Sequence, residues 1–335
     1  MRTVSELEER LARPSAGLVD DLARLDGDIM ILGAGGKLGP SLVRLALNAT
    51  RGGKRVVAVS RFSEPGLADA LASEGATVVS ADVADEAALR DLPDVENVVF
   101  LVGAKFGTQG AEHATWFTNS YLPGRVADRF RHSRIAALST GNVYPLTPVT
   151  SGGATEETKP DPVGEYAMSC LGRERVMEHF SEKYGTRLAL IRLNYAVEMR
   201  YGVLVDLAQK IVAGEPIDLA TGQVNVVWQG YANEVTLRAL LHADAPPYLL
   251  NLTGPELISV RQAARDLGRA IGKEPILVGE EAPTALLSNA GRCHRLFGYP
   301  ELTPAELIEH TARWVSDGGP LLGKPTKFER RDGRF

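Results

Sequence analysis

The clearest chemical signal in this sequence of 335 residues is a glycine-rich segment near its beginning. The apolar run Ile29–Leu32 leads directly into Gly33-Ala34-Gly35-Gly36-Lys37-Leu38-Gly39, which has the spacing G-x-x-G-x-x-G, and a segment of helical character follows. Glycines at these places allow a tight turn, let a diphosphate approach the backbone and let the helix pack close to the strand. The helix N-terminus then offers N–H groups and a positive dipole end to the phosphates. The segment predicts a dinucleotide site, with a purely structural turn as the alternative; its predicted contacts are Gly33, Gly35, Gly36, Lys37, Leu38 and Gly39.

The end of the next apolar run indicates which dinucleotide is bound. An NAD site has an acidic residue about 20 residues after the loop, where it binds the ribose 2′-hydroxyl. Ser60 occupies that place and Arg61 follows it. There is no carboxylate to repel a 2′-phosphate, and the guanidinium can pair with it. With Lys37 as a second nearby cation, the sequence favours NADP, with NAD as the second choice and a solvated Arg61 as the alternative.

Strand-like and helix-like segments alternate over the first 193 residues. The strand-like runs are rich in Val, Ile and Leu and show little alternation, as expected for strands buried on both faces; they are Asp28–Leu32, Arg55–Ser60, Thr77–Ser80, Asn97–Val102, Ile135–Ser139 and Leu188–Leu193. Between them lie segments with helical spacing: Leu38–Thr50, Gly66–Glu74, Glu86–Asp91, His113–His132 and Glu165–Tyr184. This order predicts an α/β fold with a Rossmann-like, doubly wound parallel sheet.

The remaining segments divide the chain into four parts. We expect an N-terminal helical extension over residues 1–25, an NAD(P)-binding domain over 26–193, a smaller helix-rich substrate lobe over 194–320 and a charged tail over 321–335. The lobe is predicted from four segments with helical spacing, Leu204–Ala213, Tyr231–Ala243, Val260–Ile271 and Pro304–Asp317.

Composition and charge exclude several classes of protein. A formal net charge of -5 argues against a nucleic-acid partner, which usually meets a basic patch. No apolar run approaches the roughly 18 residues of a membrane span. The two cysteines cannot form a disulfide framework, so we expect a cytoplasmic protein. The six histidines are scattered, and no metal site is predicted.

Further motifs follow the glycine segment in a fixed order. They are Ala81-Asp82-Val83, Leu101-Val102-Gly103-Ala104-Lys105, Asn119, Leu138-Ser139-Thr140-Gly141-Asn142-Val143-Tyr144, Glu165-Tyr166, Arg192-Leu193-Asn194-Tyr195 and Asn251-Leu252-Thr253-Gly254. In this order, over about residues 28–317, they resemble the extended short-chain dehydrogenases/reductases, the NAD-dependent epimerase/dehydratase family, which acts largely on sugars.

The resemblance implies roles for individual residues. Tyr166 would pass a proton to or from a substrate oxygen while hydride moves to or from nicotinamide, and Thr140 would donate a hydrogen bond to the same oxygen. The implied cofactor contacts are Asp82, Val83, Val102, Gly103 and Tyr166. Lys105 lies in the loop after the fourth strand and is a candidate catalytic residue that contacts cofactor or substrate. The candidate substrate contacts are Thr140, Asn142, Asn194, Arg200 and Trp228, with a core aromatic as the alternative for Trp228. Tyr195, Tyr201 and Gln229 are also expected on loops that face the cleft.

The sequence departs from the family at two places. The motif Y-x-x-x-K reads Tyr166-Ala-Met-Ser-Cys170, so the lysine that lowers the tyrosine pKa is absent, and its loss should penalise oxidation more than reduction. Arg173 on the same helical face is a possible substitute or a structural residue. In residues 222–231 the arginine typical of members that bind nucleotide sugars is absent.

These features predict an NAD(P)-dependent oxidoreductase or epimerase that acts on a small sugar or sugar acid. A non-catalytic NADP-binding sensor or scaffold of the same fold is the alternative, and the missing lysine motivates it. The resemblance also implies a homodimer formed through the helices at residues 113–132 and after Glu165.

Overall fold

A seven-stranded parallel sheet forms the centre of the molecule, in the strand order β12-β7-β5-β4-β1-β2-β3. The structure is a computed structural model, which describes residues 1–105 and 110–334. The strands are β1 (Ile29–Leu32), β2 (Val56–Ser60), β3 (Thr77–Ser80), β4 (Asn97–Phe100), β5 (Arg134–Thr140), β7 (Arg187–Leu193) and β12 (Tyr248–Leu252). All seven pair in parallel, so their carboxyl ends meet at one edge. The predicted doubly wound α/β fold is confirmed.

Two hydrophobic cores cover the two faces of this sheet, because successive strand residues point to opposite sides. Ile29 and Ile31 of β1 belong to one core, whereas Met30 and Leu32 belong to the other. The first core includes residues of α2 (Ala16–Arg24), α3 (Gly39–Thr50), α4 (Leu67–Ser73) and α10 (Gln229–Arg238). The second includes residues of α5 (Glu86–Arg90), α7 (Leu122–Arg129) and α8 (Gly164–Tyr184).

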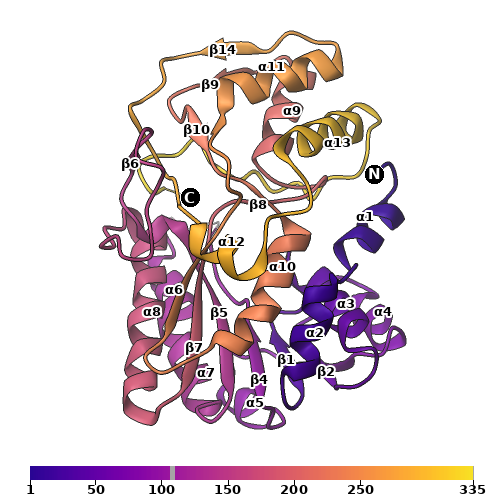
Figure 1. The fold of residues 1–335 in the computed structure, drawn as a ribbon, viewed down its shortest axis with the longest axis vertical. Coiled ribbons are helices and arrows are strands. Elements are labelled where there is room, and N and C mark those ends of the chain that lie inside the picture. The colour runs from indigo at the N-terminus through magenta and orange to yellow at the C-terminus, as the bar shows by residue number, and fades with distance from the viewer. Residues whose placement is uncertain (106–109, 335) are drawn as a thin grey trace.

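A second lobe lies beyond the carboxyl ends of the strands, in the upper half of Figure 1. Its helices α9 (Val203–Ala213), α11 (Val260–Ile271) and α13 (Pro304–Ser316) pack against one another. Short strand pairs connect them: β8 (Ala196–Val197) with β11 (Val227–Trp228), β9 (Pro216–Asp218) with β14 (Ile276–Val278), and β10 (Gln223–Val224) with β13 (Ile258–Ser259). Lower down, β6 (Thr147–Pro148) pairs with β15 (Thr284–Ala285), and α12 (Gly291–Phe297) packs on β12.

The chain returns from this lobe to the sheet, which the sequence did not indicate. Helix α10 packs on α3, and β12 pairs in parallel with β7 as the seventh strand. Residues 229–252, assigned above to the substrate lobe, therefore complete the cofactor-binding sheet. The reason is physical: without β12, the apolar β7 would form an unpaired edge.

Both ends of the chain pack against the body of the molecule. The N-terminal extension forms two helices, α1 (Val4–Leu11) and α2, and Glu8 of α1 pairs with Arg44 of α3 at 3.1 Å. Residues 321–334, which we call the C-terminal strap, cross from α13 toward β6 and α8 (Figure 1). Phe328 in this strap is buried.

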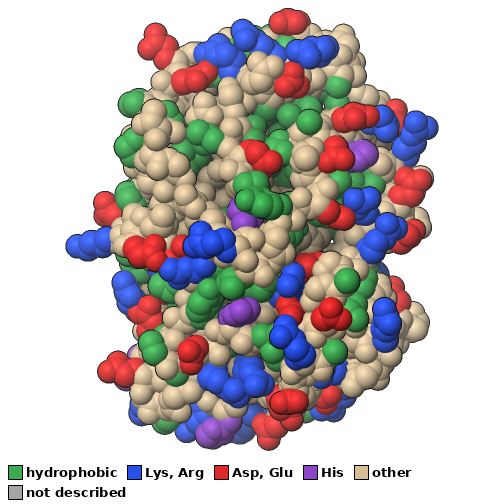
Figure 2. All heavy atoms as spheres, in the orientation of Figure 1, with side chains coloured by type: hydrophobic (Ala, Val, Ile, Leu, Met, Phe, Trp, Pro, Cys, Tyr) green, Lys and Arg blue, Asp and Glu red, His purple; other side chains and the backbone are tan. Residues whose placement is uncertain are grey.

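Basic and acidic side chains are interspersed on the face of the molecule shown in Figure 2. Among the described residues, no helix combines the length and apolar character needed to cross a membrane.

Candidate active site

The glycine segment forms one wall of a cavity at the carboxyl edge of the sheet. This cavity has a volume of about 330 Å³. Its lining brings together nine of the predicted cofactor contacts, Gly33, Gly35, Gly36, Ser60, Arg61, Asp82, Val83, Val102 and Gly103. They come from four successive strand ends, β1 to β4, as ligands of a doubly wound sheet do.

Close packing explains why glycine is needed in this loop. Gly33 has a φ of +93°, which side chains rarely adopt. A Cβ on Gly39 would lie 2.3 Å from the carbonyl oxygen of Ala34, and one on Gly35 would lie 2.8 Å from the hydroxyl of Ser60. The loop therefore brings the start of α3 against β1 and leaves the backbone open toward the cavity.

Arg61 lies at the mouth of the cavity, and its side chain is 75% exposed. Its guanidinium is 3.9 Å from the carboxylate of Asp82, so the two side chains flank the same end of the cavity. Ser60 and Arg61 line the cavity, but the carboxylate of Asp82 beside Arg61 corrects the expectation that no carboxylate lies near the place of a 2′-phosphate.

A second cavity of about 290 Å³ continues from the first toward α8. It shares Gly33, Gly36, Leu101 and Gly103 with the first cavity and adds Lys105, Tyr166 and Arg173. A third cavity of about 170 Å³ continues from there and shares Lys37, Lys105, Ser139 and Tyr166 with the second. The three form one path along the sheet edge, and Tyr166 stands where the second and third meet. We call the third the substrate cavity.

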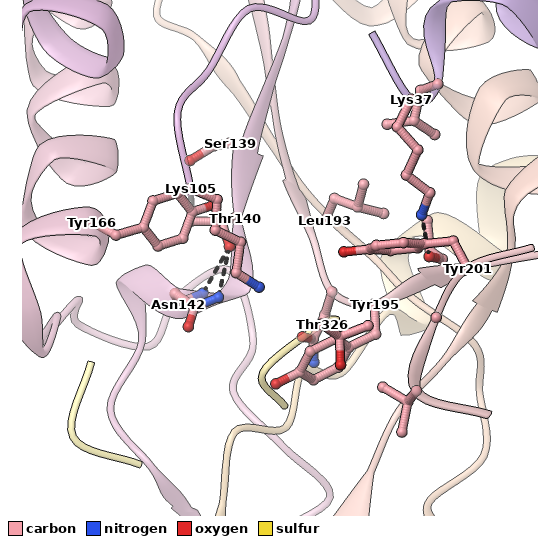
Figure 3. Close-up of a pocket in the computed structure, with 15 residues that line it drawn as sticks. Lys37, Lys105, Ser139, Thr140, Asn142, Tyr166, Leu193, Tyr195, Tyr201 and Thr326 are labelled. Atoms are coloured by element: carbon pink, nitrogen blue, oxygen red, sulfur yellow. Dashed lines mark hydrogen bonds between the residues drawn. The ribbon is translucent and has the colours of Figure 1, made fainter. Parts of the chain in front are cut away.

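The substrate cavity has two walls (Figure 3). Tyr166, Thr140, Asn142 and Lys105 form one, which we call the sheet wall because β4, β5 and α8 position its residues. Tyr195, Tyr201 and Thr326 face it together with Lys37, and we call this the lobe wall. The predicted substrate contact Asn194 also lines the cavity and is itself buried.

Burial determines the protonation state of Tyr166 on the sheet wall. Burial raises the pKa of Tyr166 far above its usual value, although a hydrogen bond with Thr140 opposes the rise. The Thr140 hydroxyl oxygen also accepts from Asn142, at 3.2 Å from its backbone nitrogen and 3.0 Å from its side-chain nitrogen. Tyr166 is therefore a neutral phenol near pH 7.

Arg173 does not line the substrate cavity, although its positive charge acts to lower the pKa of Tyr166. Its buried guanidinium donates to the carbonyl oxygens of Leu138, of Val102 at 3.1 Å and of Asn119 at 3.2 Å. It thus ties the ends of β4 and β5 to α8, and the structural interpretation holds. Cys170, at the lysine position, is buried, and burial raises its pKa, so it is a neutral thiol.

Lys105 is a second cation close to Tyr166. Its Nζ lies 5.8 Å from the ring centroid of Tyr166 and 5.8 Å from that of Tyr195. Burial lowers its pKa to about 8. The backbone of Ala104 is held by Asn119, whose side-chain oxygen accepts from its N–H and whose side-chain nitrogen donates to its carbonyl, both at 2.8 Å.

Asn119 reaches this position because the predicted helix 113–132 is not continuous. It is divided into α6 (Glu112–Trp116), the π-helix η1 (Phe117–Tyr121) and α7. Such π-turns often occur at functional sites. Here the turn buries Asn119 and aims it at the loop after β4.

Three predicted residues lie elsewhere than expected. Lys37 points away from Arg61 into the substrate cavity, where its Nζ donates to the carbonyl of Ala196 at 2.8 Å and lies 3.6 Å from the ring centroid of Tyr201. Arg200 is outside the cavity, because Glu8 and Glu198 hold its guanidinium. Trp228 is fully buried in the core, so the alternative named for it applies.

The lobe wall contains two tyrosines that were expected on loops facing the cleft, Tyr195 and Tyr201, and one residue that sequence reasoning missed, Thr326. Tyr195 follows the Arg192-Leu193-Asn194 motif directly, and its φ of +46° turns the chain into the cavity. Tyr201 lies on the same connection and also lines the cavity. For Thr326 there was no signal, because it belongs to the segment taken for a charged tail.

The C-terminal strap closes one side of the substrate cavity. The backbone N–H and the hydroxyl of Thr326 donate to Asp206 of α9 at 2.8 and 2.5 Å. Arg331 donates to the carbonyl of Thr284 at 2.7 Å. Gly333 lies so close to the start of α8 that a Cβ on Gly164 would be 2.5 Å from its carbonyl oxygen. The strap therefore spans from the second lobe to the helix that carries Tyr166.

The donor groups here suit an organic cofactor. Within residues 1–105 and 110–334, no group of three or more His, Cys, Asp or Glu side chains is placed to hold a metal ion. The glycine loop and the start of α3 fit a dinucleotide, since they offer N–H donors and close backbone approach.

Comparisons with known proteins agree with this geometry. The structure resembles a UDP-galactose 4-epimerase with 20% identity, 87% of this chain and 99% of that chain covered and a TM-score of 0.68. It also resembles the UDP-glucuronic acid 4-epimerase from Bacillus cereus in complex with NAD (17% identity, coverage of 87% and 99%, TM-score 0.71) and Pal from Bacillus thuringiensis (15%, 87% and 99%, 0.72). No curated protein matches the chain in sequence. The model of the NAD dependent epimerase/dehydratase family matches residues 29–232. The predicted family is confirmed, and this chain belongs to the NAD-dependent epimerase/dehydratase family.

Proposed function

We propose that this protein is an NAD(P)-dependent oxidoreductase or epimerase that transfers hydride at a carbonyl or hydroxyl carbon of a small sugar-like molecule. The observation that carries the proposal is the position of Tyr166 and Thr140. They share a hydrogen bond at the junction between the cofactor cavities and the substrate cavity. A carbonyl oxygen placed between them has a proton donor and a hydrogen-bond donor within reach.

The residues of the sheet wall suit reduction. NADPH, when bound, supplies the hydride to the carbonyl carbon. Thr140 donates a hydrogen bond to the carbonyl oxygen, and Tyr166 transfers its phenolic proton to that oxygen as negative charge develops there. Because burial keeps Tyr166 protonated, reduction starts from the form that is already present, whereas oxidation must first remove this proton. Epimerisation requires both directions and is therefore expected to be slower than reduction.

NADP is the cofactor that we propose, with NAD as the second choice. Ser60 and Arg61 line the cavity where the adenosine ribose would lie, and the exposed guanidinium of Arg61 can pair with a 2′-phosphate. Lys37 does not contribute there, because it lies in the substrate cavity.

A small substrate is supported by the size and closure of the substrate cavity. Its volume of about 170 Å³ is below the roughly 300 Å³ at which pockets for drug-sized ligands begin. The strap residue Thr326 occupies one side of it. A sugar or sugar acid fits these dimensions better than a nucleotide sugar.

A homodimer is the assembly that we propose. Large apolar side chains are exposed along α6, η1 and α8, namely Trp116, Phe117, Tyr121, Val163 and Met168. Light scattering of the wild type should give the mass of a dimer, and Tyr121→Glu should give a monomer, whereas Ile276→Glu, an exposed apolar residue on β14, should leave the dimer intact.

The function is tested by incubating the protein with NADPH or NADP and a panel of keto sugars, sugars and sugar acids. Cofactor fluorescence reports net oxidation or reduction, and NMR of the products reports epimers. We expect a change in cofactor redox state with at least one sugar-like carbonyl compound. Cofactor binding without redox change or epimers over the panel would instead support the non-catalytic sensor.

A further inference from the structure

Two lysines from distant parts of the chain converge on the substrate cavity. Lys37 comes from the glycine loop before α3, and Lys105 comes from the loop after β4. We propose that Lys37 and Lys105 form an anion-binding subsite, and that the substrate is a sugar-like molecule carrying a carboxylate or a phosphate ester. This inference rests on the proposed function, because it names the substrate class of the same site.

The lining of the cavity favours a negative ligand. Among its described residues, the charged side chains are the two lysines, and the others are polar or apolar. Three tyrosines, Tyr166, Tyr195 and Tyr201, present their rings to the two ammonium groups. Aromatic rings attract cations but leave the positive charge in place. The cavity therefore offers positive charge without a carboxylate in its lining.

The carboxylates that act on Lys37 are Glu198 and Asp206, and neither lines the cavity. Glu198 pairs with Arg200 at 3.1 Å, and Asp206 accepts two hydrogen bonds from Thr326 of the strap. Both act on Lys37 from a distance, since each raises its pKa. Arg200 offsets the charge of Glu198, whereas Asp206 is hydrogen-bonded to neutral groups of the strap.

Lys37 is aimed at a ligand by its surroundings. Its ammonium group has three N–H donors, and one is used on the carbonyl of Ala196. The ring of Tyr201 fixes the side chain from one side. Burial lowers the pKa of Lys37 to about 7, and the like charge of Lys105 contributes to this to a smaller extent.

Both lysines line the substrate cavity and also the second cavity, which the glycine loop borders. The cavity lined by the glycine loop, Ser60 and Arg61 includes neither lysine. In Figure 3, Lys37 lies beside Tyr201 on the lobe wall, and Lys105 lies beside Tyr166 on the sheet wall. A small molecule that fills this cavity of about 170 Å³ can place its anionic group near the lysines and its reacting carbon at Tyr166 and Thr140.

The inference is tested by calorimetric binding to the NADP-loaded protein. The probes are D-gluconate, which carries a carboxylate, D-glucose 6-phosphate, which carries a phosphate ester, and D-glucitol, an uncharged polyol of similar size. We expect at least one of the anions to bind about tenfold or more tightly than D-glucitol. The anion that binds more tightly shows whether the subsite prefers a carboxylate or a phosphate ester.

Variants then test the lysines themselves. Lys37→Met and Lys105→Met should each weaken binding of the preferred anion about tenfold to a hundredfold and leave D-glucitol binding unchanged. Lys37→Arg keeps the charge and should retain most of the anion affinity, which separates a charge effect from misfolding. Lys183→Met, on the exposed last turn of α8, is the matched control and should bind like the wild type.

Equal affinity for D-glucitol and both anions would overturn the proposal. So would unchanged anion affinity in both methionine variants that fold. A parallel loss of NADP affinity would show that the lysines neutralise the cofactor phosphates and would also overturn it. Because binding is measured without turnover, the result does not depend on whether the protein is catalytically active. The anion preference and the proposed catalytic function can therefore fail separately.

Discussion

The two walls of the substrate cavity are built in different ways. On the sheet wall, Thr140 and Tyr166 stand on a strand end and a long helix that Arg173 ties together through buried hydrogen bonds. The lobe wall consists of Tyr195 and Tyr201 on a connection between lobes and Thr326 on the C-terminal strap. From this difference we expect changes on the sheet wall to affect the reaction itself and changes on the lobe wall to affect which molecule is bound.

Tyr166→Phe should have the largest effect of any single change on the sheet wall. Loss of the phenolic proton should lower kcat about a thousandfold, with little effect on NADPH affinity. Steady-state kinetics and fluorescence titration of NADPH measure the two quantities. Tyr184→Phe, at the far end of the same helix, is the control, and unchanged turnover in Tyr166→Phe would remove this residue from the mechanism.

Glu174→Gln should destabilise the support beneath the sheet wall. Glu174 and Arg192 form a fully buried ion pair with a distance of 2.6 Å, and Ser139 donates to the same carboxylate at 2.6 Å. Breaking such a pair leaves an uncompensated buried charge and should lower the free energy of unfolding by about 3–5 kcal/mol. Urea denaturation measures it.

The exposed pair of Arg175 with Glu178 on the same helix provides the comparison. Glu178→Gln should change the unfolding free energy by only about 0–1 kcal/mol. Equal losses in the two variants would show that the buried pair has no special part in holding β7 to α8.

Arg61→Ala should separate the two cofactors. Removing the guanidinium should weaken NADPH binding about tenfold to a hundredfold, since a charge-assisted contact to the 2′-phosphate is lost, and should leave NADH binding nearly unchanged. Fluorescence titrations with both cofactors measure this. If the two affinities fall together, or neither falls, Arg61 does not read the 2′-phosphate.

Tyr201→Leu tests the lobe wall. The ring lies against the ammonium group of Lys37, and its loss should raise KM about fivefold to tenfold while kcat stays within about twofold. A fall in kcat as large as that of Tyr166→Phe would contradict the separation of roles between the walls.

The affinity for an anionic ligand should depend on pH. Burial lowers the pKa of Lys105 to about 8 and that of Lys37 to about 7. The ammonium forms that attract an anion are therefore lost as the pH rises through these values. The charged or titratable groups that act on the two lysines are Glu198, Arg200, Asp206, Cys170 and Lys327. Binding of D-gluconate should therefore be tighter at about pH 6.5 than at about pH 9 by several-fold, and binding of D-glucitol should not change.

Much of the sheet wall could be predicted from the sequence, because local patterns determine it. The glycine spacing, the apolar strands and the motifs around Thr140 and Tyr166 are each contiguous. Asn119 and Arg173 were located on their helices, but the π-turn that aims Asn119 at Ala104 depends on packing against α8.

The lobe wall could be predicted only in part, because distant segments build it. Lys37 is adjacent to the phosphate loop in sequence, yet the carbonyl of Ala196 and the ring of Tyr201 direct it to the substrate side. Thr326 is placed by Asp206, which lies 120 residues earlier. Neither contact leaves a pattern in the neighbouring residues.

The most direct test of the account is a crystal structure of the protein with NADPH and D-gluconate bound. We predict the nicotinamide ring in the cavity between Gly103 and Tyr166, with its reactive carbon about 3–3.5 Å from the carbon of the ligand nearest Tyr166. The 2′-phosphate should contact Arg61, and the carboxylate should lie at Lys37 and Lys105. A nicotinamide ring bound away from Tyr166, or a carboxylate outside the two-lysine cavity, would contradict the account.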